Sequence, residues 1–213
     1  MNGPLDGIKV IDLSTIVSGP LAGSLLGDQG ADVIKIESPL RPDNARFMGP
    51  IRGESGALFA AANRSKRSLA LDLKKDGSKE IIYQLIKNSD VIIDNFRPGI
   101  LKKLGLEYED VKKHNSKIIQ LSITGYGVDG PYSKRRVYDP LIQATAGIAN
   151  AQSIDGNPKF VKTLMCDKIT SLTAAQSVTA ALYAREKTNE GQKINLSMLD
   201  TALYFRWSDN MYN

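Results

Sequence analysis

The chain has 213 residues, of which 42% are hydrophobic and 24% are charged, and its formal net charge is +5. This composition is ordinary for a globular protein, and the length suffices for one good-sized core or one domain with an appendage. So small a charge mildly favours anionic ligands, but without a basic stripe interleaved with aromatics it gives no signature of nucleic-acid binding.

The first half of the chain alternates between strand and helix patterns. Gly19-Pro20 opens an apolar helix that ends at Gly30, and residues 75–88 place three isoleucines and a leucine on one helical face. Residues 38–56 are rich in Pro, Gly and Arg and predict an irregular loop. Short apolar runs predict strands over residues 8–13, 31–36, 68–73, 91–93 and 118–123. This alternation predicts a parallel sheet with helices on both faces.

In such a sheet, ligands bind beyond the carboxyl ends of the strands. Asn95 and Phe96 follow one predicted strand and suit an adenine or ribose, and Arg97 suits a phosphate, although a turn before a helix at Ile100 explains the same residues. Residues 125–130 fit G-x-G-x-x-G, but no apolar helix follows, as a dinucleotide fingerprint requires. We therefore expect a flexible glycine loop near a ligand.

The second half begins with an Ala-, Thr- and Leu-rich helix pattern over residues 169–185, followed by a strand pattern over 193–198. Asp167 stands before this helix, where it fits either an N-cap or a nucleophile. Cys166 beside it is a rival nucleophile, but no histidine lies nearby to activate it, and a buried cysteine is usually a small hydrophobe.

Cysteine and histidine each occur once, as Cys166 and His114. An intramolecular disulfide is therefore impossible, and we expect no metal site. His114 lies in a polar stretch typical of a solvated helix end, so a catalytic triad is hard to build on it. We expect no signal peptide and no membrane span, with a cytoplasmic location as the default and a mitochondrial or peroxisomal one open in a eukaryote.

Seven segments stand in the order and spacing of one known family. They are IKVIDLSTIVSG (8–19), GADVIKIE (30–37), NRSKRSLALDLK (63–74), DNFRPG (94–99), LSITGYGVDGPY (121–132), VYDPLIQATAG (137–147) and GQKINLSMLD (191–200). Together they make the chain resemble the family III CoA-transferases, the L-carnitine dehydratase and bile-acid-inducible protein F type, which includes formyl-CoA transferase and α-methylacyl-CoA racemase. The resemblance covers nearly the whole chain.

The resemblance implies an α/β fold, namely a Rossmann-like large domain built on a parallel sheet. Residues 1–198 would form the first pass of this CoA-binding domain, and residues 199–213 would start a linker helix toward a smaller domain. Family members are usually about twice as long and interlock as homodimers of linked rings. We therefore expect the chain to be an N-terminal half, and its activity alone is open.

The resemblance also implies transfer of CoA from an acyl-CoA donor to a small carboxylic acid. Coenzyme A would be a substrate, with no tightly bound cofactor, metal, nucleic acid or membrane partner. Asp167 aligns with the aspartate that attacks the thioester and forms a mixed anhydride. Contacts with CoA are implied for Val17, Ser18, Arg41, Leu71, Lys74, Asn95, Phe96, Arg97, Lys103, Arg136 and Tyr138.

Two positions separate the branches of the family. Val17 stands near a glutamine of the formyl-CoA transferases, which argues against formyl or oxalyl specificity. Tyr138, followed by Asp139, stands where the racemases carry a catalytic histidine. Because tyrosine is a poor base near neutral pH, racemase or dehydratase chemistry is the less favoured alternative. An inactive CoA-transferase fragment is another.

Overall fold

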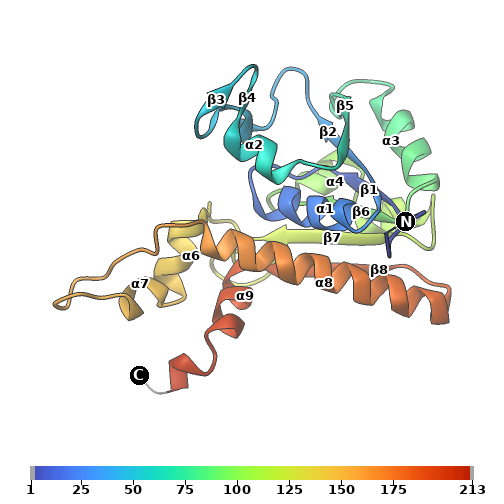
Figure 1. Ribbon diagram of the computed structural model, residues 1–213. Helices are drawn as coiled ribbons and strands as arrows, with labels where there is room; N and C mark the ends of the chain where they lie inside the picture. The colour runs from blue at the N-terminus through green and yellow to red at the C-terminus, as the bar shows by residue number, and fades with distance from the viewer. Residues whose placement is uncertain (1–2, 212–213) are drawn as a thin grey trace.

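The computed structural model describes residues 3–211, which form an α/β layered structure around one parallel sheet (Figure 1). Its strand order is β5-β2-β1-β6-β7-β8. The strands are β1 (Lys9–Asp12), β2 (Asp32–Glu37), β5 (Lys66–Ala70), β6 (Val91–Asp94), β7 (Ile119–Thr124) and β8 (Gln192–Ser197). All neighbouring strands pair in parallel, as the β-α-β alternation predicted.

Helices cover both faces of the sheet because the side chains of its central strands alternate between two cores. On β6, Val91 and Ile93 face one core while Ile92 faces the other, and all three are fully buried. The first core lies under α1 (Ser18–Asp28), α6 (Asp139–Thr145), α8 (Met165–Thr188) and α9 (Met198–Phe205). The second lies under α3 (Ser78–Lys87), α4 (Ile100–Leu104) and α5 (Tyr108–Lys112).

The chain leaves the centre of the sheet in two directions. From β1 it runs outward through β2 to β5, and from β6 it runs outward through β7 to β8. The connections after β1 and β6 therefore diverge, which opens a crevice between the carboxyl ends of these two strands. Residues 15–16 and 95–98 line this crevice from its two sides.

Several predicted boundaries were wrong. β5 spans Lys66–Ala70 rather than residues 68–73, because the buried Lys66 amine is neutralised by Asp12 at 2.7 Å and can enter a strand. Residues 38–56 are not irregular throughout. They contain η1 (Asn44–Phe47), β3 (Ile51–Arg52) and β4 (Ser55–Gly56), ahead of α2 (Ala57–Ala62).

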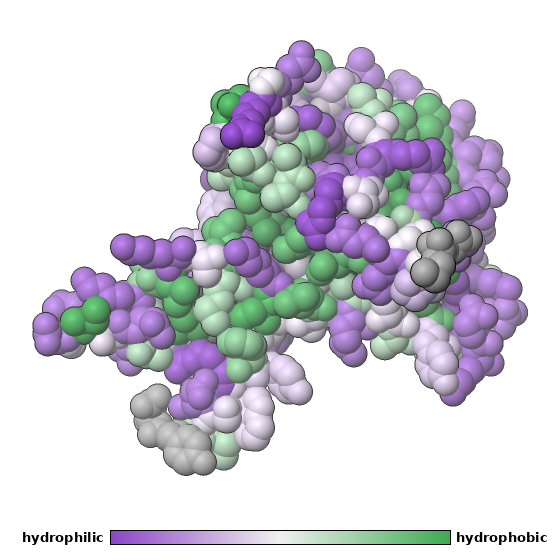
Figure 2. Space-filling view, in the orientation of Figure 1, coloured by the Kyte–Doolittle hydropathy of each residue, from purple (hydrophilic) through white to green (hydrophobic). Residues whose placement is uncertain are grey.

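The end of the chain continues the large layered structure before it projects from it. α9 begins at Met198 and packs against α8 and α6, and η2 (Asp209–Met211) follows. Apolar surface gathers around the junction of these helices, where Leu141, Leu172 and Leu203 are exposed (Figure 2). The division at residue 198 stays a prediction, and its last two residues lie outside the described range. Within residues 3–211, no helix combines the length and apolar character that crossing a membrane requires.

Candidate functional site

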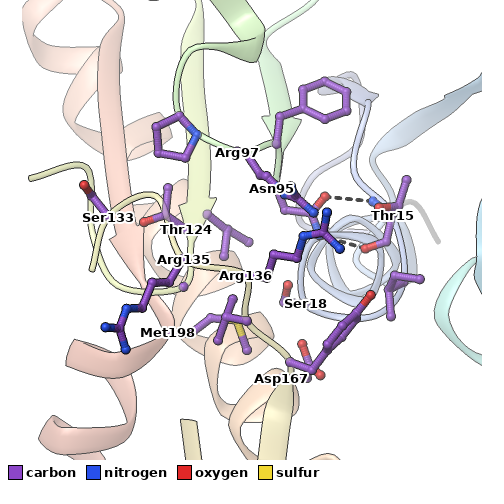
Figure 3. Close-up of a pocket in the computed structure, with 17 residues that line it drawn as sticks. Thr15, Ser18, Asn95, Arg97, Thr124, Ser133, Arg135, Arg136, Asp167 and Met198 are labelled. Atoms are coloured by element: carbon purple, nitrogen blue, oxygen red, sulfur yellow. Dashed lines mark hydrogen bonds between the residues drawn. The ribbon is translucent and has the colours of Figure 1, made fainter. Parts of the chain in front are cut away.

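A cavity of about 210 Å³ opens at the crevice between β1 and β6 (Figure 3). Asp167 reaches it from the first turn of α8, and Thr15, Asn95 and Thr124 reach it from the ends of three strands. Its wall also includes Ile16, Ser18, Phe96, Arg97, Gly125, Ser133, Arg135, Arg136, Val137, Tyr138 and Met198. The sheet therefore gathers segments that are distant in sequence around one carboxylate, at the place that the strand pattern indicated.

The Asp167 carboxyl is almost fully buried, with 8% of the residue exposed. Burial raises its pKa to about 7, and the nearby charge of Asp139 adds to this effect, while the hydroxyl and main-chain amide of Ser18 bond to the carboxyl and oppose it. Asp167 is not the N-cap of α8, since Leu164 occupies that position. The side chain is thus free to face the cavity, and it exchanges its proton near neutral pH.

Asp139 binds the main-chain amide of Asp167, and the sequence analysis gave it no role. The Asp167 amide donates to Asp139 Oδ2 at 3.0 Å, and Gln143 Nε2 donates to Asp139 Oδ1 at 2.5 Å. The main-chain amide of Val161 in turn donates to Gln143 Oε1 at 2.9 Å. This network fixes the start of α8. Its signal in the sequence was an acid and an amide four residues apart at a helix start.

Cys166 lies next to Asp167 but does not share its chemistry. Its side chain is fully buried, and burial, together with the charges of Asp139 and Asp167, raises the pKa of the thiol to about 12. Cys166 is therefore protonated at neutral pH and does not line the cavity. It behaves as the small core residue that the sequence analysis favoured over a nucleophile.

The loop after β1 is held at three consecutive residues. Asn95 accepts from the Thr15 amide at 2.9 Å and donates to the Thr15 carbonyl at 2.7 Å. The Ile16 amide donates to both carboxylate oxygens of Asp43, at 3.0 and 3.1 Å. Lys35 Nζ donates to the Ser14 carbonyl at 2.7 Å. These contacts fix the backbone that leads into α1 and its first residue, Ser18.

A larger cavity of about 680 Å³ shares part of its wall with the first one. The shared residues are Thr15, Asn95, Phe96 and Arg97. Farther out, the larger cavity is lined by Leu13, Ile36, Glu37, Ser38, Leu40, Arg41, Asp43, Leu71, Asp72, Leu73, Lys74, Ile100 and Leu104. Its outer cations are exposed and its inner wall is largely apolar, which suits a long anionic molecule with a flat ring.

Most of the residues that the resemblance assigned to CoA lie around these two cavities. Ser18, Arg136 and Tyr138 line the first, Arg41, Leu71 and Lys74 line the second, and Asn95, Phe96 and Arg97 line both. Two do not fit. Val17 is buried, with 3% of the residue exposed, and lines neither cavity, and Lys103 is exposed on α4 outside both. The argument against formyl or oxalyl specificity therefore loses its basis, because Val17 does not face the cavity.

Asp94 lies beneath the turn that both cavities share. It is buried at the end of β6, accepts from the Phe96 amide at 3.1 Å and from Ser122 Oγ at 2.6 Å. Burial raises its pKa to about 6, against the lowering effect of these two hydrogen bonds. Asp94 thus shapes the turn that carries Asn95 and Arg97. The turn also starts α4 at Ile100, as one interpretation of this segment predicted, while contact with a ligand stays a prediction.

Two other features of the sequence lie where they contribute little chemistry. Residues 125–130 form a loop without a following helix, so the glycine pattern is no dinucleotide motif. Only Gly125 of its glycines lines the first cavity. His114 follows α5 and stacks on the Tyr83 ring at 3.9 Å between centroids, so it is less solvated than predicted. It lines neither cavity.

Comparisons with known proteins agree with this architecture. The chain is 39% identical to acetyl-CoA:oxalate CoA-transferase of Acetobacter aceti, over 95% of this chain and 53% of that protein. It is 38% identical to succinate–glutarate CoA-transferase of Agrobacterium fabrum, over 98% and 54% respectively. A CAIB/BAIF family protein from Brucella suis superposes with a TM-score of 0.95 at 39% identity, covering 100% of this chain and 57% of that one.

The chain thus spans about half the length of the curated relatives that it matches. The family model for CoA-transferase family III matches residues 5–212, which is almost the entire described range. All seven sequence segments, from residue 8 to residue 200, lie within this match. The chain belongs to CoA-transferase family III.

Proposed function

We propose that the chain carries the nucleophile and most of the CoA-binding wall of an enzyme that moves CoA between two carboxylic acids. The single observation that supports this most strongly is the position of Asp167. Its carboxyl lines the smaller cavity where α1 and α8 begin, with Ser18 donors on one side. A carboxylate partly stripped of water is a stronger nucleophile than a solvated one.

The proposed reaction begins when an Asp167 oxygen attacks the thioester carbonyl of the donor acyl-CoA. The C–S bond breaks, so that an aspartyl–acyl anhydride and a CoA thiolate form. The acceptor carboxylate then displaces the donor acid at the aspartyl carbonyl, which gives a second anhydride. The thiolate attacks the acyl carbon of this anhydride, releasing the new acyl-CoA and the Asp167 carboxylate. No redox partner and no water enter the balance.

The negative charge that develops on the attacked carbonyl needs donors close to Asp167. Ser18 supplies a hydroxyl and an amide at this place, and Arg97 and Arg136 line the same cavity (Figure 3). Proton exchange near neutral pH also matters, because only ionised Asp167 is nucleophilic. The same residues that bury the carboxyl would keep water away from an anhydride, whose hydrolysis would waste the thioester.

The second cavity fits the distant part of CoA. Phe96 and Leu71 offer apolar contact for an adenine ring, and Lys74 and Arg41 are exposed cations for phosphates. Arg97 lies on the wall shared with the first cavity, where the chain of CoA would pass from one to the other. Binding energy gained here can support distortion and desolvation at the thioester.

We further propose a short dicarboxylic acid as one of the exchanged acids. The relatives named above act on oxalate, or on succinate and glutarate, by their names. A cavity of about 210 Å³ admits an acyl group of that size. Arg135 and Arg136 line it and could meet a second carboxylate.

The test is chemical capture of the anhydride. The purified chain is mixed with acetyl-, succinyl- or oxalyl-CoA, alone and with its full-length protein where the gene encodes more, and then treated with hydroxylamine or borohydride. Peptide mass spectrometry should locate a hydroxamate or a reduced side chain at Asp167, and none in Asp167→Asn. An adduct on Cys166, or an unmodified Asp167 during measurable transfer, contradicts the assignment.

Racemase or dehydratase chemistry on this scaffold has less support. Among the described residues, no histidine lines either cavity, and Tyr138 is 63% exposed at the rim of the first. Racemisation needs a base that removes the proton next to the thioester carbonyl. Incorporation of deuterium at that carbon from heavy water, without CoA transfer, would favour the racemase alternative over the one proposed.

A further inference from the structure

Ile16 has an unusual backbone conformation for its residue type. Its φ is 71°, in the left-handed region that β-branched side chains rarely adopt. It stands two residues before the start of α1 and lines the cavity that contains Asp167. Such a conformation persists only where the surrounding structure imposes it, and it often marks a functional loop. The contacts of Ile16 therefore indicate which function the conformation of this loop serves.

A buried ion pair imposes this conformation. Asp43 is 1% exposed, and both of its carboxylate oxygens accept the Ile16 amide. Lys35, 2% exposed, lies 3.2 Å from Asp43 and donates to the Ser14 carbonyl. The pair therefore forms hydrogen bonds with the loop at Ser14 and Ile16, the residues on either side of Thr15. A fully buried pair of this kind is costly in desolvation and is poorly explained by stability alone.

The loop leads directly to the groups that contact Asp167. Ser18 follows Ile16 by two residues, and its hydroxyl and amide bond to the Asp167 carboxyl. Ser171 Oγ lies 2.8 Å from the main-chain oxygens of both Ser18 and Asp167, which joins the start of α1 to α8. A turn of the backbone at Ile16 would move Ser18 away from the carboxyl.

We propose that the buried Lys35–Asp43 pair is a positioning element for Asp167, which holds Ile16 in its left-handed conformation so that Ser18 is aimed at the carboxylate. This role rests on the proposed function, because it gives the pair a purpose in the reaction. Neither residue of the pair touches the reacting atoms. Asp43 reaches the site through Ile16 and Ser18, and Lys35 reaches it through Asp43 and Ser14.

The first test is an NMR titration of the Asp167 carboxyl in the purified chain, with carbonyl-labelled aspartate and Asp167→Asn for assignment. In Asp43→Asn, one neutral amide oxygen should hold the Ile16 N–H more weakly than the carboxylate does, so Ser18 should move away and the titration midpoint should rise by about one pH unit. A direct charge effect has the opposite sign, since removing an anion and leaving Lys35 unpaired would lower the midpoint. A rise is therefore specific to positioning. A fall, or no change in a folded variant, overturns the proposal.

Two further variants separate positioning from stability. Asp43→Asn leaves a buried lysine without its partner and should lower the melting temperature, whereas the double change Lys35→Met with Asp43→Asn should recover much of that loss. The raised midpoint should remain in the double variant, because the Ile16 amide still lacks its carboxylate. If the midpoint returns together with the stability, the pair is merely structural and the proposal fails.

Ile16→Gly supplies the rescue. Glycine adopts positive φ without strain, so the loop should depend less on the Asp43 carboxylate to keep its conformation. In the Asp43→Asn background, Ile16→Gly should move the Asp167 midpoint back toward that of the unaltered chain. The matched control is Asp32→Asn, which breaks an exposed pair with Arg67 at 2.6 Å and should leave the midpoint unchanged. A shift in this control as large as that of Asp43→Asn contradicts the proposal.

Turnover provides the link to the reaction. In an active enzyme, Asp43→Asn should lower kcat about 10- to 100-fold while KM for acyl-CoA changes little, because Asp43 is only 1% exposed in the wall of the second cavity and the change removes none of that cavity's cations. If the unaltered protein forms no Asp167 adduct, the proposed function fails. The NMR titration still tests independently whether the ion pair positions Ser18. If the unaltered protein is active and Asp43→Asn equals it, only the positioning role fails.

Discussion

The two cavities share a wall but are built by opposite means. The smaller one contains the buried Asp167, and hydrogen bonds within the chain hold Asp167, Thr15 and Asn95 in place. The larger one has exposed cations at its rim, Arg41 and Lys74, and an apolar inner wall. The first is organised before any ligand arrives, and the second depends on the ligand for its polar contacts. Chemistry and binding are therefore separable by mutation.

Asp167→Asn should separate the roles of the two cavities with the largest effect. We expect the anhydride adduct to disappear and transfer to fall by about 10³-fold or more, since no other carboxylate among the described residues lines the cavity. Single-turnover assays with acyl-CoA measure this loss. CoA binding, followed by calorimetry, should change little, because the second cavity keeps its residues. A variant with substantial transfer would remove Asp167 from the mechanism.

The same substitution should stabilise the fold at alkaline pH. The pKa of Asp167 is about 7 when folded and near 3.8 when unfolded, so the folded chain binds the proton more tightly. Its stability contribution therefore falls as pH rises from about 4 to 7, and the penalty is complete above 7. Asp167→Asn removes this penalty, which corresponds to roughly 2–4 kcal/mol at pH 8. Urea unfolding at pH 4 and pH 8 checks it, with little difference between the variant and the unaltered chain expected at pH 4.

Asp139→Asn tests how the charge of Asp139 affects Asp167, and its expected effect is smaller than that of Asp167→Asn. In the unaltered enzyme, acylation should rise with pH through about 7 as Asp167 ionises. Because the Asp139 charge raises the Asp167 pKa, its removal should move this profile toward lower pH and increase the rate at pH 6 by up to about tenfold. A profile of kcat against pH measures the shift. A move toward higher pH would mean that the lost contact to the Asp167 amide outweighs the charge.

The larger cavity predicts a different signature. Lys74→Ala should raise KM for acyl-CoA by about three- to tenfold and leave kcat nearly unchanged, since Lys74 lines the larger cavity and not the one that contains Asp167. The effect should shrink at high salt, because an exposed cation is screened. Lys75→Ala is the matched control, as its side chain is exposed but lines neither cavity. Equal effects from both variants would argue against a specific phosphate contact.

Part of this architecture was predictable from the sequence, and the reasons are physical. The six strands follow from apolar runs such as 91–93, whose residues are buried on both faces. The shifted start of β5 was not predictable, because the buried amine of Lys66 pairs with Asp12, which lies 54 positions earlier. Asp167 was found by resemblance, since locally it fitted an N-cap. Asp139 and Asp43 were missed because their roles depend on contacts made only in the folded chain.

The smallest expected effect concerns the neighbour of the nucleophile. Cys166→Ala should leave transfer unchanged, because burial raises the pKa of the Cys166 thiol to about 12 and the residue lines neither cavity. The folded chain should lose about 1 kcal/mol from the small void in its core. Thiol-directed reagents should likewise fail to inactivate the native protein while they label the unfolded one. Inactivation by modification of Cys166 would mean that reagents can pass from the cavity that contains Asp167 into the core behind it.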